Sequence, residues 1–196
     1  MKALLSSTYF GPIQWYQKLI RYPEVLIEHH DSYQKQTYRN RCLIATTNGV
    51  QALTVPIGQD MTISDHGNWR HQHWQALTSA YGDSPFFIYY EDDLRPFFTE
   101  RWERLYDFND AICLKMCQLL DISPHISPTS HYLKGTGLDG IDDFRDSIQP
   151  KHPQEDPQFC PRHYYQVYER KHGFLPNLSI LDLLFNMGPE SIFYIM

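Results

Sequence analysis

The sequence predicts a single α/β domain in which a mixed sheet has a parallel βαβ start, a hairpin and flanking helices. Two short apolar segments, residues 3–7 and 25–27, enclose an amphipathic segment at residues 13–21. Further along, Asn48-Gly49 separates two β-prone runs, and later segments show helical periodicity. Strand patterns that alternate with helix patterns in this way are typical of α/β proteins.

The first three segments predict a βαβ unit. Gly11-Pro12 marks a turn after the first strand, and Ile13, Tyr16 and Ile20 then share one helical face. Pro23 ends that helix before the second apolar segment. Because a strand, a helix and a strand follow one another within about 30 residues, we expect two parallel strands joined by a right-handed crossover.

Residues 41–45 and 50–57 predict the two strands of a hairpin. Asn48-Gly49 lies between them, and this dipeptide favours the tight turns that join antiparallel strands. Pro56 has no backbone N–H to donate, so it marks the end of the second strand or an edge position.

Two helices are expected in the middle of the chain. The first ends before Gly82, and Asp65 or Asn68 is the expected N-cap. The second begins at Asp107 and continues to Leu120 with apolar residues at helical spacing.

Residues 123–162 have a different composition, with six of the thirteen prolines and several aspartates. We expect a mobile surface excursion from the one domain that spans residues 1–196, with a short helix at 142–148. Residues 164–168 then resemble a strand.

The tail predicts a last helix over residues 179–187. Ser179 and Asp182 form a variant of the capping box, and Gly188-Pro189 ends the helix. Asn177 and Asp182 are also candidate ligand-binding residues. An architectural role for this segment is the alternative.

Composition excludes several classes of protein. The 17 basic and 23 acidic residues give a net charge of −6, which argues against a protein that coats nucleic acid or an anionic membrane. We find no signal peptide and no apolar run of about 20 residues. We therefore expect a cytoplasmic protein with reduced cysteines and no nucleic-acid or membrane partner.

Two motifs that resemble cofactor or metal sites are discounted. Residues 135–140 match G-x-G-x-x-G, but the aspartates around that segment would repel a pyrophosphate. The ten histidines form no HExxH motif, and Cys113 and Cys117 are spaced like buried helical thiols. We expect neither a cofactor nor a metal, and no catalytic residue is identifiable from a nucleophile motif.

Residues 33–41 contain three cations in an otherwise acidic chain. If Arg39 and Arg41 lie in a strand, they project from the same face, and together with Lys35 they suit a phosphate or carboxylate. Tyr38 and Asn40 supply neutral donors, and Tyr9 ends the first strand at the same sheet edge. We expect these six residues to bind an anion. A solvated edge strand is the alternative.

Several segments, in the same order along the chain, resemble the WbqC-like protein family of bacteria, in a form similar to that of Bacteroides-like organisms. The most specific are Tyr-Arg-Asn-Arg and Leu-Ser-Ile-Leu-Asp-Leu-Leu-Phe-Asn. The resembling segments are residues 9–12 with Lys35, 38–41, 53–56, the helix that begins at Trp69 with residues 80–81 and 84–85, and 173–190.

The resemblance implies a pathway more firmly than a reaction. Members of the family occur in O-antigen and related surface-polysaccharide gene clusters, and aminoacyl (glycyl) transfer to a sugar has been suggested. The resemblance implies a transferase acting on a nucleotide sugar or an amino-acid derivative. A non-catalytic binding or scaffold protein of the same pathway is the alternative, and the sequence leaves the choice and the oligomeric state open.

Overall fold

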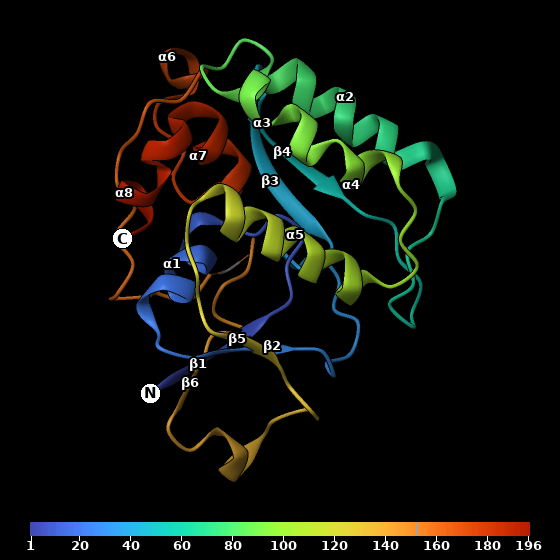
Figure 1. Ribbon diagram of the computed structural model, residues 1–196, viewed down its shortest axis with the longest axis vertical. Helices are drawn as coiled ribbons and strands as arrows, with labels where there is room; N and C mark the ends of the chain where they lie inside the picture. The colour runs from blue at the N-terminus through green and yellow to red at the C-terminus, as the bar shows by residue number, and fades with distance from the viewer. Residues whose placement is uncertain (152) are drawn as a thin grey trace.

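The computed structural model describes residues 1–151 and 153–196 (Figure 1). Its centre is a parallel sheet with the strand order β5-β2-β1-β6. The strands are β1 (Lys2–Ser6), β2 (Val25–Glu28), β5 (Ile126–Pro128) and β6 (Ile141–Asp143).

The predicted βαβ unit is confirmed. Helix α1 (Ile13–Arg21) connects β1 to β2, and the two strands pair in parallel from Ala3↔Val25 to Ser6↔Glu28. Residues Ala3 to Ser6 are all buried, as expected for a strand in the middle of a parallel sheet. The carboxyl ends of β1 and β2 therefore meet at one edge of the sheet.

The hairpin is confirmed as well. Strands β3 (Arg41–Thr46) and β4 (Gly49–Thr54) pair antiparallel up to Thr46↔Gly49, and Gly49 has a φ of 101°. That φ is open to glycine and strained for other residues, which explains the Asn-Gly turn. The hairpin forms its own two-stranded sheet beside the parallel one.

Residues 123–162 differ from the expectation. The short helix expected at residues 142–148 is wrong, because Ile141–Asp143 pair with β1 as strand β6, and Phe144 N–H continues this pairing to Leu4 C=O at 2.9 Å. The same segment supplies β5 on the other edge of the sheet. Two strands of only three residues carry no periodic signal, so only their partners reveal them.

The strand expected at residues 164–168 is also wrong. Tyr164 and Gln166 are buried while Tyr165 is exposed, so the two-residue alternation is real. These residues pair with no strand of the described chain, and their buried side chains point to helix α7 (Ile180–Met187) instead.

The helices cover the sheet and the hairpin (Figure 1). Helix α2 begins at Trp69, but neither Asp65 nor Asn68 makes the expected side-chain cap. Helix α5 begins two residues before Asp107, which lies in its first turn. Besides α1 and α7, the helices are α2 (Trp69–Tyr81), α3 (Phe87–Leu94), α4 (Pro96–Thr99), α5 (Leu105–Leu119), α6 (Glu169–His172) and α8 (Ile192–Ile195). The described residues also form the 3₁₀ turns η1 (His66–Asn68), η2 (Gly135–Leu138) and η3 (Gly188–Ser191).

Helix α7 ends at Met187 as expected and begins one residue later than expected, because Ser179 is its N-cap. Ser179 Oγ accepts a hydrogen bond from Leu181 N–H at 3.3 Å, as an N-cap does. Asp182 does not complete the capping box, because its carboxylate bonds to other elements. At the far end Gly188 has a φ of 54°, and a Cβ there would lie 2.4 Å from the Phe86 ring, so this position requires glycine.

The hydrophobic core lies between the sheet, the hairpin and helices α2, α4, α5 and α7. Aromatic rings dominate its centre: Phe10 stacks on Phe98 with ring centroids 5.9 Å apart, and Tyr9 stacks on Phe108 at 5.8 Å. None of the helices in the described residues is long and apolar enough to cross a membrane.

Candidate active site at the carboxyl edge of the sheet

Arg39 is not in a strand, because β3 begins only at Arg41. The Arg39 side chain is 3% exposed, and its Nε donates to Asp31 Oδ2 at 2.6 Å. Lys35, by contrast, is exposed in the loop before it. The structure therefore separates the predicted cations by environment: one is buried and neutralised by a carboxylate, and one faces solvent.

Two neighbours of Arg39, Tyr38 and Asn40, hold the chain between the two sheets. Tyr38 C=O accepts from Tyr9 N–H at 2.9 Å, so these two predicted residues do lie together. Asn40 Nδ2 donates to Val55 C=O at 2.8 Å and closes the base of the hairpin. The Arg41 side chain is partly buried, and its Nε has no hydrogen-bond partner among the described residues.

Tyr9 faces the helical side of the core. Its hydroxyl lies 2.8 Å from His73 Nδ1, and both side chains are buried. Burial lowers the pKa of His73 to about 4, although a hydrogen bond with the Thr54 backbone acts in the opposite direction. Burial also raises the pKa of Tyr9 well above its usual value, so the pair is neutral at physiological pH.

Asn177 and Asp182 have internal partners. Asn177 Oδ1 accepts from Gln14 N–H at 2.9 Å and so links the tail to the first turn of α1. Asp182 is fully buried and accepts from Tyr81 Oη at 2.7 Å and Tyr164 Oη at 2.7 Å. Burial raises the pKa of Asp182, while the hydrogen bonds that it accepts act against that rise. These contacts agree with the architectural alternative.

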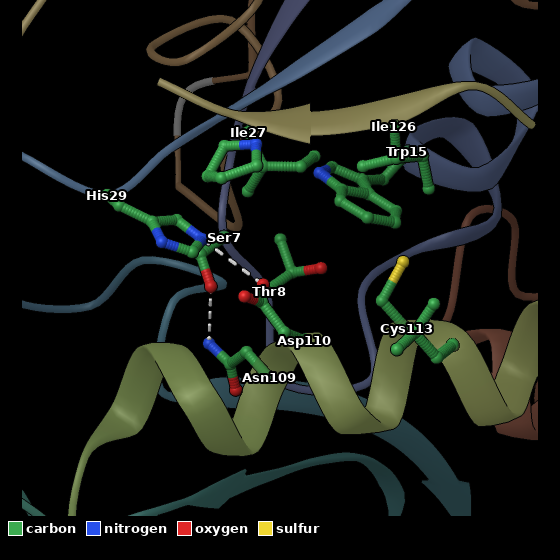
Figure 2. Close-up of a pocket in the computed structure, with 11 residues that line it drawn as sticks. Ser7, Thr8, Trp15, Ile27, His29, Asn109, Asp110, Cys113 and Ile126 are labelled. Carbon is green, nitrogen blue, oxygen red and sulfur yellow. Dashed lines mark hydrogen bonds and ion pairs between the residues drawn. The ribbon is translucent and has the colours of Figure 1, made fainter. Parts of the chain in front are cut away.

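A pocket of 170 Å³ opens where the carboxyl ends of β1 and β2 face helix α5 (Figure 2). Ser7 and Thr8 follow β1, and His29 follows β2. Helix α5 contributes Asn109 and Asp110. The other lining residues are mainly apolar: Trp15, Ile27, Cys113, Leu114, Ile126 and Pro128.

Two hydroxyls line this pocket beside the loop after β1. Asn109 Nδ2 donates to Ser7 Oγ at 3.0 Å and to Arg39 C=O at 2.8 Å, so the loop that carries Arg39 is tied to the pocket wall. Thr8 Oγ1 is buried and has no hydrogen-bond partner among the described residues. It lies so close to Gly11 that a Cβ there would be only 2.5 Å away.

His29 and Asp110 form the titratable pair of the pocket. His29 Nε2 lies 3.1 Å from Asp110 Oδ1, and the two side chains are 19% and 44% exposed. The imidazole also stacks on the Tyr106 ring at 4.9 Å, and Tyr106 Oη donates to Asp31 Oδ1 at 2.5 Å. The ring is therefore oriented on two sides, yet a substrate can reach the pair from solvent.

A buried ion pair supports the strand end that carries His29. Glu28 is fully buried and accepts from Arg145 Nη1 at 2.8 Å and from Thr129 Oγ1 at 2.8 Å. Glu28 also accepts from the backbone N–H of His30 at 2.9 Å. This network joins β2 to the residues after β5 and β6, so the 123–162 segment helps to build the site.

Sequence reasoning did not identify His29 and Asp110 as a site. No motif in the sequence links the two residues, because they lie 81 positions apart. The signal that finds them is positional: residues directly after parallel strands gather at the edge where open α/β sheets bind ligands. In the described part of the chain, no group of three or more His, Cys, Asp or Glu could hold a metal ion.

Fold and site define an α/β protein whose pocket lies at the carboxyl edge of a parallel sheet and carries a histidine–carboxylate pair. The chain belongs to the WbqC-like protein family, whose model matches residues 7–152 and so includes every residue that lines the pocket. It is also similar to the uncharacterized protein Rv1507c of Mycobacterium tuberculosis, with 28% identity over 98% of this chain and 96% of the relative. No solved structure matches.

Proposed function

We propose that the protein is a transferase that moves a small acyl group, such as an aminoacyl (glycyl) group, onto a sugar precursor of surface-polysaccharide biosynthesis. The observation that carries the reaction is the His29–Asp110 pair, 3.1 Å apart in a pocket at the carboxyl edge of the sheet. The proposed pathway is inferred from the WbqC-like family, and the proposed reaction is inferred from the residues of the pocket.

The size of the pocket favours a small group. A dry cavity of about 150 Å³ accommodates one benzene molecule, whereas sites for whole drug-sized ligands span about 300–1,000 Å³. A pocket of 170 Å³ therefore suits an aminoacyl or short acyl group. The sugar and any nucleotide attached to it would stay outside the pocket, on the solvent side.

The His29–Asp110 pair supplies general-base chemistry. In the tautomer that donates Nε2–H to Asp110, His29 Nδ1 carries the lone pair that takes the proton of an acceptor hydroxyl or amine. The acceptor then attacks the carbonyl carbon of an activated ester or thioester. The alcohol or thiol of the donor leaves and receives that proton, while Asp110 stabilises the transient imidazolium.

The proposed anionic substrate is a nucleotide sugar or an amino-acid derivative. Lys35 is exposed, and no ion pair in the described residues includes Lys35 or Arg41. Lys35 is therefore open to an anionic substrate, and Arg41 is a partly buried cation that lacks a counter-ion among the described residues. Arg39 contributes to the proposed site only through its backbone C=O, which accepts from Asn109 in the pocket wall.

The test combines a transfer assay with three variants. Purified protein is incubated with glycyl thioester or ester donors and a panel of nucleotide sugars, and mass spectrometry detects the aminoacylated product. We expect His29→Gln and Asp110→Asn to reduce the rate by about 10² or more, the usual range for loss of a general base. His131→Gln is the matched control, because His131 is exposed and lies outside the pocket.

Two outcomes would overturn the proposal. If His29→Gln transfers at the rate of the unmodified protein, the pair has no catalytic role. If the sugars stabilise the protein in a thermal-shift assay and no donor supports transfer, the protein is the non-catalytic binding member of the pathway instead.

A further inference from the structure

A second, wider cavity lies between helices α2 and α4. These two helices contact each other, and α2 also packs on strand β3 of the hairpin (Figure 1). It measures 340 Å³, and its lining includes Arg70, Arg95, Arg101, Asp65 and Trp74. We call it the arginine groove. None of its lining residues lines the carboxyl-edge pocket.

The charge of the arginine groove is opposite to that of the chain. Three arginines line the groove, and Asp65 is the only acidic residue among the described residues that line it. Asp65 accepts from Arg70 Nη1 at 2.5 Å, and its other oxygen lies 3.6 Å from Arg101 Nε. The groove thus has a surplus of two positive charges in a protein whose net charge is −6.

Aromatic rings hold two of these guanidinium groups in place. The Arg70 guanidinium lies 4.7 Å from the Trp69 ring centroid, and that of Arg95 lies 5.8 Å from the Trp74 ring centroid. A ring fixes a guanidinium without using its N–H donors in conventional hydrogen bonds. The donors are therefore positioned before any ligand arrives.

Arg70 has unused hydrogen-bonding capacity. Its side chain is only 13% exposed, and Nε and Nη2 are buried with no hydrogen-bond partner among the described residues. Buried guanidinium nitrogens are normally paired, so two unpaired ones on one side chain indicate a missing acceptor. A merely solvated basic patch would expose these atoms to water.

We propose that the arginine groove binds the phosphoryl group of a small molecule, a phosphate or a diphosphate. Guanidinium forks match phosphate oxygens in pairs, and a surplus of two positive charges suits a dianion better than a single carboxylate. The volume is in the range of ligand sites and exceeds what one phosphate needs. This proposal about phosphoryl binding does not depend on the transfer reaction proposed for the carboxyl-edge pocket.

Isothermal titration calorimetry with inorganic pyrophosphate tests the proposal, and UDP in a second arm distinguishes the source of the phosphoryl group. Equal affinity for both probes indicates that only the phosphates are held, whereas tighter binding of UDP indicates a nucleoside diphosphate. We expect Arg95→Ala and Arg101→Ala each to weaken binding by about tenfold, and Arg95→Lys to retain only part of the affinity because the fork is lost.

Arg170→Ala is the matched control, because Arg170 is exposed on α6 and lies outside the groove. His29→Gln should leave pyrophosphate binding unchanged, so the outcome is separate from the fate of the proposed transferase. The proposal is overturned if the double variant Arg95→Ala/Arg101→Ala, shown to be folded by circular dichroism, binds pyrophosphate as well as the unmodified protein. An equal loss in Arg170→Ala would also overturn it, since the binding would then be non-specific.

Discussion

Arg39 Nε donates to Asp31 Oδ2 at 2.6 Å, and each of the two side chains is only 3% exposed. Tyr106 Oη donates to the other oxygen of the same carboxylate. The pair therefore closes the loop between β2 and β3 and at the same time holds the ring on which His29 stacks. An arginine expected to bind a ligand here has an internal partner that orients the site.

We predict that Arg39→Ala lowers the free energy of unfolding by about 3–5 kcal/mol, because it leaves the Asp31 carboxylate buried and unpaired. Urea unfolding followed by circular dichroism measures the loss. Lys35→Ala is the control and should change stability by no more than about 0.5 kcal/mol, since Lys35 is exposed. A stability of Arg39→Ala within that margin would show that the pair contributes nothing.

The buried His73 makes stability depend on pH. Its pKa is about 4 in the folded protein and about 6.5 when unfolded, so the unfolded chain binds more protons between these values. The contribution of neutral His73 to the free energy of unfolding is complete above about pH 6.5 and is lost as the pH falls towards 4. It amounts to about 3 kcal/mol over that window.

Urea titrations at intervals from pH 7 to pH 4 measure this slope. His73→Gln retains a polar partner for Tyr9 and removes the titrating group. Between pH 7 and pH 4 its free energy of unfolding should therefore fall by about 3 kcal/mol less than that of the unmodified protein. Parallel slopes for the two proteins would assign the acid sensitivity to other groups.

A second buried ion pair anchors the 123–162 segment. Lys18 Nζ lies 2.5 Å from Asp156 Oδ2, with the two side chains 0% and 8% exposed. We predict that Asp156→Ala costs about 3–5 kcal/mol, because the Lys18 ammonium then has no counter-ion. The exposed Glu155 is a neighbour suited to a control, and Glu155→Ala should be nearly neutral.

Hydrogen–deuterium exchange gives the matching local measurement. In the unmodified protein the amides of β6 should be protected, because β6 pairs with β1. In Asp156→Ala their exchange should accelerate more than that of the hairpin. Fast exchange of β6 in the unmodified protein would mean instead that the whole excursion is mobile.

Asp182 organises the tail by accepting hydrogen bonds from Tyr81, Tyr164 and Gln166. We predict that Asp182→Ala destabilises the protein by about 3 kcal/mol or more, because the buried hydroxyls of Tyr81 and Tyr164 lose their acceptor. Asp182→Asn should cost less, since its amide oxygen still accepts one hydrogen bond. Melting temperatures of the two variants check the order, and equal values would contradict it.

Local signals in the sequence determined a large part of the fold. Apolar segments, helical spacing and the Gly-Pro and Asn-Gly turns were sufficient for β1, α1, β2 and the hairpin, because each forms between residues close in the chain. The family, too, is recognisable from short motifs such as Tyr-Arg-Asn-Arg at residues 38–41, which lies within the matched residues 7–152.

Only the tertiary structure decided the sheet edges and the site. Strands β5 and β6 are three residues long and exist because β2 and β1 offer them partners. His29 and Asp110 are 81 positions apart, and they meet only because helix α5 faces the carboxyl ends of β1 and β2. The physical reason is the same in each case: a contact between distant segments is set by packing of the whole chain, which local periodicity does not encode.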